Sequence, residues 1–449
     1  MPVEVLAHIL LTACGVFAAR PRTFLLYRSA FMQVCTTWRA VVCGDTRFWS
    51  GVFIGDCRIL SVLDLWISRS LSVPLHLFVD TGSYAVDSGS FTRIWCSFLD
   101  LVPVVLDRVS RISLLDKHGD RGALILRCLS NMAASRAVRL DICTTSCTEI
   151  DARVLERGRW GRYSETSRTL TPVHLLPSAA LAFLTVRHTF VILNPCMLSG
   201  LHSLWLGPIP CGVRLSWVSL RDMLMACSVL ELLTCDDVQC EYGLFEQCDL
   251  PSLLQLHFVS RHWSAEYMFA ALRLPSLQVL SLGGCASFVS ESIAGRPCQE
   301  LASVKRLALQ HEEYSAVDFV DILRPFVNVK ALDLRQMHPS SVSAFVGIKK
   351  ALRSVGVQLT GRLCPSLESV LLAVALSEID VLDVLSASSP TIFSSRCSLS
   401  WDCSAAWDRE GVLGVKGTYC VVDGSVVSSP YYAVEGSGAH VAHEDPFAS

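Results

Sequence analysis

The chain lacks the features that place a protein in or across a membrane. None of its apolar runs approaches the roughly 18 uninterrupted residues of a bilayer span, and the candidate at Ala179–Leu184 is soon followed by Arg187. The chain has only three asparagines, none of them in an Asn-x-Ser/Thr glycosylation sequon. The apolar run Val5–Ala19 follows Glu4 and has no lysine or arginine before it, the opposite of a signal peptide. We therefore expect neither membrane insertion nor secretion.

Charged residues are also scarce. They make up 18% of the chain, against roughly 25% in an average soluble domain, while hydrophobic residues reach 51%. This excess of apolar side chains requires a large continuous core. The formal net charge of -3 gives no reason to expect nucleic acid as a partner.

Motifs for catalysis and metal binding are missing. There is no Gly-x-Ser-x-Gly elbow, no Gly-rich phosphate loop with lysine and no His-Glu-x-x-His helix, so an enzyme is not expected. Twenty cysteines are scattered without compact spacing. The densest group, Cys235, Cys240 and Cys248 with His257 and His262, lacks a Cys-x-x-Cys pair, so neither zinc nor another cofactor is expected. Free cysteines that serve as small apolar core residues indicate a reducing compartment, the cytoplasm or the nucleus.

The first fifty residues contain two apolar segments separated by a polar one. Apolar residues from Val5 to Leu10 fall at the spacings of one face of an amphipathic helix, and Pro2 suits its first turn. The same spacing over Phe31–Val42 predicts a second helix, and Arg20-Pro21-Arg22 is interpreted as a linker. One interpretation is a plain helical hairpin in which the aromatic side chains only form a core.

The order of residues in this region resembles the F-box, a three-helix module that docks onto the Skp-type adaptor of a cullin–RING ubiquitin ligase. The resemblance rests on Pro-x-Glu-Val-Leu at residues 2–6, Val-Cys-x-x-Trp-Arg at 34–39 and Arg-Phe-Trp at 47–49. The positions that this resemblance assigns to adaptor binding are Pro2, Val5, Leu6, Ile9, Val34, Cys35, Trp38 and Trp49. Some of them must hold the module together instead, and the sequence does not divide the two sets.

A short leucine phrase repeats through the middle of the chain. The pattern Leu-x-x-Leu-x-Leu begins, in full or in part, at residues 201, 230, 253, 277, 304 and 329, with starts 29, 23, 24, 27 and 25 residues apart. This interval resembles that of leucine-rich repeats, in which each unit supplies a short strand and a return segment. Stacked units bury one another's leucines, which accounts for the apolar excess. The alternative is an ordinary α/β domain with coincidental leucine spacing.

The expected architecture is α/β: an N-terminal three-helix F-box followed by a leucine-rich-repeat-like solenoid with a parallel concave sheet. We place the F-box at residues 1–53, a connecting region at 54–107 and the solenoid at 108–384. Weaker phrases at Val109–Leu114, Ala137–Ile142 and Leu181–Val186 belong to the solenoid range. An irregular, partly flexible extension is expected at 385–449.

The residues that alternate with the leucines are the candidates for target binding. Successive side chains of a strand point to opposite faces, so the third, fifth and seventh positions of each phrase should face away from the core. This set includes an aromatic residue and arginines, which are frequent among interface hot spots. The candidates are Trp205, Thr234, His257, Arg306, Gln310, Asp333 and Arg335.

Together, these resemblances imply a substrate-recognition subunit of an SCF-type cullin–RING ubiquitin ligase. The F-box would bind the Skp-type adaptor, and the repeats would bind a target protein that the sequence does not identify. A similar order of box and divergent repeats occurs in F-box proteins of mushroom-forming fungi. The alternatives are a repeat scaffold that recruits no ligase and a secreted repeat protein.

Overall fold

The structure is a computed structural model of the whole chain. It describes residues 1–16, 21–54, 60–80, 108–116, 138–144, 173–175, 181–187, 191–193, 198–207, 215–241, 244–260, 264–284, 293, 301–310, 314–337, 364, 366–372, 398–401, 417–422 and 425–429. These residues form two compact units, with the division between residues 213 and 214.

The first unit begins with helices α1 (Val3–Val16), α2 (Pro21–Val34) and α3 (Thr36–Gly44), followed by the 3-10 turn η1 (Thr46–Trp49). The single helix expected over Phe31–Val42 is wrong, because the chain breaks at Cys35. Cys35 has an extended backbone, and its Sγ accepts a hydrogen bond from the Trp38 backbone N–H, which caps α3. The expected linker at Arg20–Arg22 is also wrong in part, since α2 begins at Pro21, while Arg20 lies outside the described residues.

A parallel sheet follows the helices. Its strands, in spatial order, are β1 (Gly51–Ile54), β2 (Leu75–Asp80), β3 (Val109–Asp116), β4 (Arg139–Thr144), β6 (Phe183–Arg187) and β8 (Ser203–Leu206). Helix α4 (Leu60–Ser70) lies between β1 and β2 in the chain, and β5 (Val173–Leu175) pairs with β7 (Val191–Leu193) separately. The sheet therefore starts at Gly51, before the expected range 108–384 and across the expected boundary at residue 53.

The second unit continues the same pattern of parallel strands. Its main sheet contains β9 (Leu232–Asp236), β11 (Gln255–Ser260), β13 (Val279–Gly284), β14 (Arg306–Gln310), β15 (Ala331–Gln336), β16 (Ser369–Leu372) and β17 (Ser398–Trp401). The antiparallel strands β18 (Gly417–Val422) and β19 (Ser425–Ser429) close it, and β10 (Cys248–Asp249) pairs with β12 (Leu272–Arg273). The extension expected to be irregular from residue 385 thus contributes strands, while residues 430–449 lie outside the described part of the chain.

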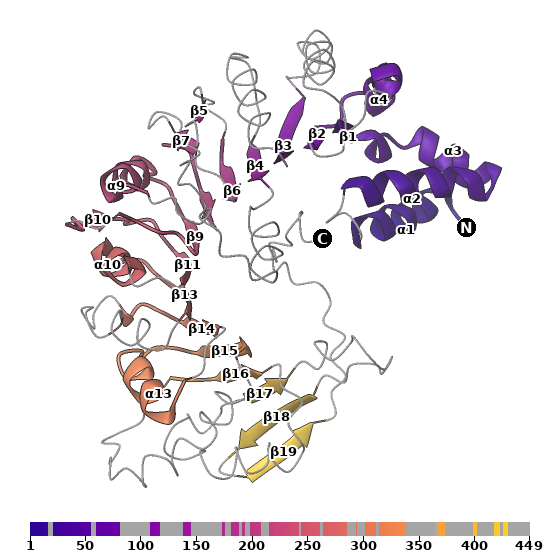
Figure 1. The fold of residues 1–449 in the computed structure, drawn as a ribbon. Coiled ribbons are helices and arrows are strands. Elements are labelled where there is room, and N and C mark those ends of the chain that lie inside the picture. The colour runs from indigo at the N-terminus through magenta and orange to yellow at the C-terminus, as the bar shows by residue number, and fades with distance from the viewer. Residues whose placement is uncertain are drawn as a thin grey trace, which may run out of the picture. The chain divides into compact units, whose positions relative to one another are not determined.

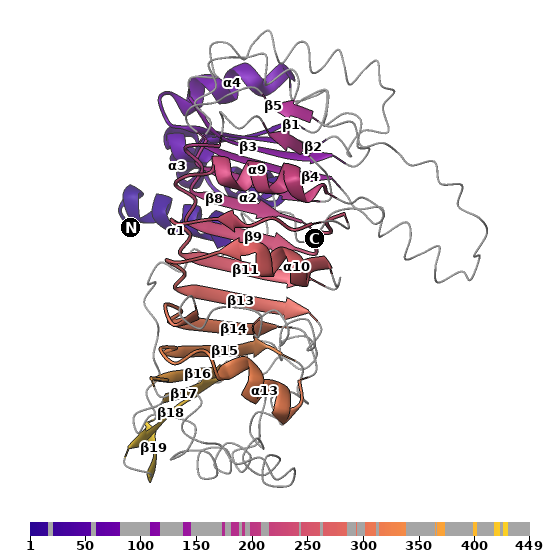
Figure 2. The ribbon, with the colours of Figure 1, turned by 90° about the vertical axis from the view of Figure 1, so that its left-hand side faces the viewer.

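Three helices cover one face of this sheet. Helices α9 (Trp217–Ala226), α10 (Ser264–Ala271) and α13 (Ala316–Leu323) lie on the same side of the strands, in front of them in Figure 2 (Figures 1 and 2). The ring of Phe258 on β11 lies 5.6 Å from that of Phe269 on α10, between ring centroids. The face that carries Phe258 is therefore the face that the helices cover.

The strands pair so that the leucines of neighbouring repeats stand side by side. One register row of the second unit runs through Leu233, Leu256, Leu280, Leu307, Leu332 and Val370, all of them buried. An equivalent buried row of the first unit runs through Val52, Leu77, Ile112, Leu140, Leu184 and Leu204. The predictions of a parallel sheet and of buried leucines are confirmed. We call the side with these rows the leucine face of each unit and the opposite side its polar face.

Candidate functional site

The residues matched to the adaptor-binding positions divide into an exposed and a buried set. Pro2, Val5, Ile9, Val34 and Cys35 are exposed, and Val5, Ile9 and Val34 keep 47%, 49% and 58% of their surface in contact with water. Val5 and Ile9 lie about one helical turn apart on α1, so they make an exposed apolar stripe on one side of that helix. These residues form a candidate docking surface.

Leu26 is a further exposed apolar residue of these helices, and the motif positions did not include it. Its side chain, on α2, is 70% exposed, and Val3 on α1 is also exposed. We call Val3, Val5, Ile9, Leu26 and Val34 together the apolar surface. A resemblance restricted to motif positions does not include Leu26, although the spacing of eight residues from Leu26 to Val34 places both on one side of a helix.

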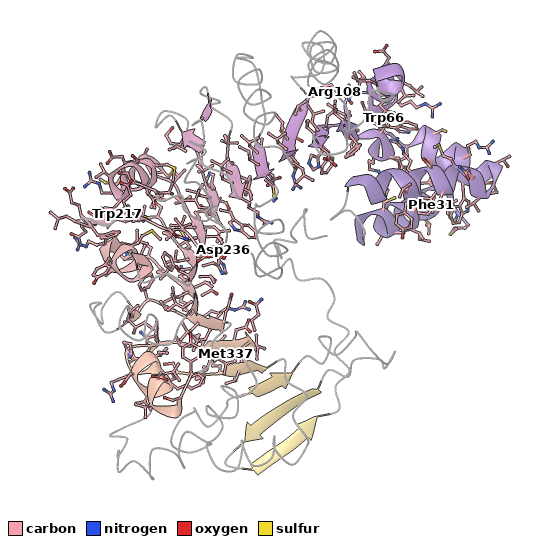
Figure 3. The ribbon with its side chains drawn as sticks, in the orientation of Figure 1. Phe31, Trp66, Arg108, Trp217, Asp236 and Met337 are labelled. Carbon is pink, nitrogen blue, oxygen red and sulfur yellow. The ribbon has the colours of Figure 1, made fainter. Side chains whose placement is uncertain are left out.

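Leu6 and Trp49 belong to the core of the module instead. Leu6 is buried with Leu10 on α1, and the Trp49 indole Nε1 donates a hydrogen bond of 2.8 Å to the Val42 carbonyl oxygen. Trp38 is half-buried, and its ring meets the ring of Phe31, labelled in Figure 3, edge-on with centroids 5.7 Å apart. These three matched residues hold the helices and the η1 turn together.

A buried arginine joins the N-terminal helices to α4. The Arg28 guanidinium carbon lies 4.5 Å from the centre of the Trp49 ring and 4.7 Å from that of Trp66, which projects from α4 (Figure 3). Arg28 Nη1 donates to the Phe48 carbonyl oxygen at 3.2 Å, and Arg69 stacks on Trp49 at 4.6 Å. Burial lowers the pKa of Arg28 to about 10, which leaves it charged at neutral pH. The cation–π contacts therefore tie α2, η1 and α4 into one body.

The predicted target-binding residues on the strands of the second unit lie on its polar face. Thr234 and His257 are register partners on β9 and β11, and both are half-buried. Arg306 Nη2 donates to the Asp333 carboxylate at 3.0 Å, which makes an ion pair between β14 and β15. Gln310 Nε2 donates to Ser281 Oγ at 2.6 Å. The side chain of Arg335 lies outside the described part of the structure.

The polar face of the first unit carries Trp205 and a cluster of charges that the sequence analysis missed. The Arg187 guanidinium carbon lies 3.8 Å from the centre of the Trp205 ring. The Asp141 carboxylate, on β4, is buried. It accepts hydrogen bonds from Arg111 Nε at 2.8 Å and from Arg139 Nε at 3.1 Å. Ser113 Oγ also donates to Asp141, at 3.2 Å.

The charged groups of this cluster shift the pKa values of their neighbours. Burial by itself raises the pKa of Asp141, but the positive charges of Arg111 and Arg139 outweigh it and hold the pKa below its usual range. His76 lies beside them, with its Nε2 2.9 Å from Ser113 Oγ. Burial and the two arginines lower the pKa of His76 well below its usual value, so the imidazole is neutral at pH 7. Asp141 is the anionic centre between two guanidinium groups.

The densest cysteine group in the sequence, for which no metal was expected, consists of buried thiols in the core. Cys235, Cys240 and Cys248 are buried and free, and burial raises the pKa of the Cys240 and Cys248 thiols to about 12. Cys240 Sγ donates a weak hydrogen bond to Met268 Sδ at 3.6 Å inside the core. His262 lies outside the described residues. Within the described ranges, no group of three or more His, Cys, Asp or Glu side chains is placed to hold a metal ion.

Among the helices that the structure describes, none is long and apolar enough to cross a membrane. Comparison with known proteins finds no matching family model and no curated protein of significant similarity.

Proposed function

We propose that this protein is the substrate-recognition subunit of an SCF-type cullin–RING ubiquitin ligase. In this proposal the N-terminal helices bind a Skp-type adaptor, and the polar faces of the leucine repeats bind a target protein. The chain performs no chemistry; it raises the concentration of the target near the ubiquitin-loaded enzyme. The cytoplasm or the nucleus, where such a ligase works, is the proposed location.

The apolar surface is the observation that carries this proposal. Five of the eight residues matched to the F-box are exposed, and three of these five are large aliphatic side chains. Exposed apolar side chains of this kind are candidates for a partner site, because covering them removes apolar surface from water. The register of parallel leucine strands supports the second half of the proposal, since stacked repeats present long surfaces for protein recognition.

A charge placed in the apolar surface tests adaptor binding. The double variant Val5→Asp and Ile9→Asp should lose at least roughly tenfold in capture by a purified Skp-type adaptor, because each carboxylate must be desolvated in the interface. Its fold should persist, since both side chains are about half exposed. The matched control is Val218→Asp on α9 of the second unit, where the valine is 50% exposed.

Point variants are preferable to truncation for this test. A cut after residue 53 divides β1 and removes Trp49, the stacking partner of Arg69 on α4. Capture that is equal for the wild type and the double variant would contradict the assigned surface. No capture of any Skp-type adaptor by the wild type would contradict ligase recruitment.

A repeat scaffold that recruits no ligase is the second candidate function. Its support is that the predicted target-binding residues Thr234 and His257 lie on the second unit, far along the chain from the N-terminal helices. The variant Thr234→Glu with His257→Glu should change the set of co-purifying proteins under either function. Capture of the adaptor by the same variant separates the two: a ligase receptor keeps it, and a scaffold never shows it.

A further inference from the structure

Two arginines stand directly opposite each other on the polar face of the first unit. Arg111 on β3 and Arg139 on β4 are register partners in a parallel pair, so their backbones lie roughly 5 Å apart. Like charges in this arrangement repel each other and destabilise a sheet. Asp141, two residues along β4, compensates for one of the two positive charges, and the pair keeps an excess of one.

Both arginines contact Asp141 through the same nitrogen. Each guanidinium donates its Nε–H to the carboxylate, and among the described residues neither donates through its terminal Nη nitrogens. The two side chains keep 27% and 22% of their surface in contact with water, whereas that of Asp141 has none. Asp141 is thus the buried centre of the cluster, and the two partly exposed arginine side chains lie around it.

An exposed aromatic ring and a neutral imidazole flank this pair in the same register row. Phe183 on β6 is the partner of Arg139 and is 39% exposed. His76 on β2 is the partner of Arg111 on the other side, and its ring lies 3.6 Å from that of Phe78, between centroids. The row therefore presents an apolar contact next to the two guanidinium groups.

We propose that Arg111 and Arg139 form an oxyanion-binding subsite that takes a phosphate or carboxylate group of a bound peptide, with Phe183 receiving an apolar side chain beside it. Guanidinium groups bind both anions through paired N–H donors, and the Nη groups here supply such donors from two adjacent strands. The subsite rests on the proposed role of the polar faces in target binding, but not on adaptor recruitment.

Fluorescent peptide pools with a fixed centre test this subsite on the full-length protein. Each pool has aspartate, phosphoserine or serine at its centre. The next residue is leucine or glycine, and the flanking residues are randomised. Fluorescence anisotropy measures the binding of each pool. The two anionic pools should bind at least roughly tenfold more tightly than the serine pool, with the advantage falling as salt is added. The tighter of the two identifies phosphate or carboxylate as the preferred group.

The key variant removes the charged cluster as a unit. Arg111→Gln with Arg139→Gln and Asp141→Asn leaves no buried carboxylate without partners, and it should abolish the preference for anionic centres. Phe183→Ala should lose only the preference for leucine over glycine, because its side chain lies at the surface. The matched control is Arg273→Gln on β12 of the second unit, an arginine that is 55% exposed.

Three results would overturn the subsite: equal binding of serine and anionic pools, an unchanged preference in the triple variant, or a lack of competition by inorganic phosphate. The competition and the Phe183→Ala variant keep the proposal testable even when the triple variant fails to fold. Adaptor capture is measured on the same preparation. A preference for anionic peptides without adaptor capture would support the subsite and contradict ligase recruitment. Adaptor capture without that preference would support ligase recruitment and contradict the subsite.

Discussion

Leu280 and Leu307 provide a sharp test of the packing between repeats. They are register partners on β13 and β14, and each is fully buried on the leucine face. Truncating such a leucine removes its transfer energy and leaves a cavity, which costs about 2–5 kcal/mol. For a unit of this size, each kcal/mol lowers the melting temperature by about 2–4 °C, so Leu280→Ala should melt roughly 4–20 °C below the wild type.

Thermal unfolding followed by circular dichroism measures this shift, and hydrogen exchange across β13 and β14 localises it. Leu244→Ala is the control, since Leu244 belongs to the same unit and is 90% exposed; its change should stay within about 0.5 kcal/mol. Because Leu280 and Leu307 share one packing site, the double variant should differ from the sum of the single variants by about 0.5–3 kcal/mol. Equal melting of Leu280→Ala and Leu244→Ala would refute the packing argument.

Three further changes probe other parts of the fold. The pKa of Asp141 in the folded protein lies below its unfolded value of about 3.9. The stabilisation by the Asp141 carboxylate is therefore complete above that unfolded pKa and is lost as the pH falls through the lower, folded pKa. In urea unfolding from pH 7 downward, Asp141→Asn should lose less stability at acid pH than the wild type does. Gly283→Ala brings a methyl group within 3.1 Å of Val259 and should cost about 1–3 kcal/mol in urea unfolding. Trp49→Phe removes the donor to the Val42 carbonyl and should cost about 1–3 kcal/mol, measured as a lower melting temperature.

The leucine rows could be predicted because their signal is local. In a strand, side chains alternate between two faces, so a phrase such as that from Leu277 to Leu282 identifies its own buried side. The nearly constant interval then predicts that units stack. The same reasoning placed His257 and Arg306 on the polar face, where the structure has them.

The charged cluster could not be predicted in this way, because it depends on the pairing of weak repeats. Arg111 and Arg139 lie 28 residues apart in the chain and meet only when β3 and β4 pair in one particular register. Their phrases lack the full leucine pattern, so the residues that alternate with the apolar positions gave no prediction for these strands. Arg111 and Arg139 are the third positions of the phrases that begin at Val109 and Ala137, so the alternation of side chains would have placed each on the polar face, although not beside the other.

The helix boundary at Cys35 was missed for a different physical reason. The apolar spacing runs without interruption from Phe31 to Val42, so periodicity alone predicts one helix. The break depends on a thiol that accepts the Trp38 backbone N–H at 3.5 Å, a weak cap with no strong sequence preference. Hydrophobic periodicity therefore located α3 and the last turn of α2, joined them incorrectly, and missed the rest of α2.

Helix α1 shows why a sequence motif alone cannot divide a docking surface from a core. Leu6 and Leu10 are buried against the rest of the module, while Val5 and Ile9, one position earlier in each turn, are about half exposed. Successive residues of a helix differ by about 100°, so these two pairs make separate apolar stripes, each four residues apart. The chain covers the first stripe with its own side chains and leaves the second in water. A helix that packs only against its own module needs one apolar stripe. The second, exposed stripe is therefore the physical basis for proposing a partner at this surface.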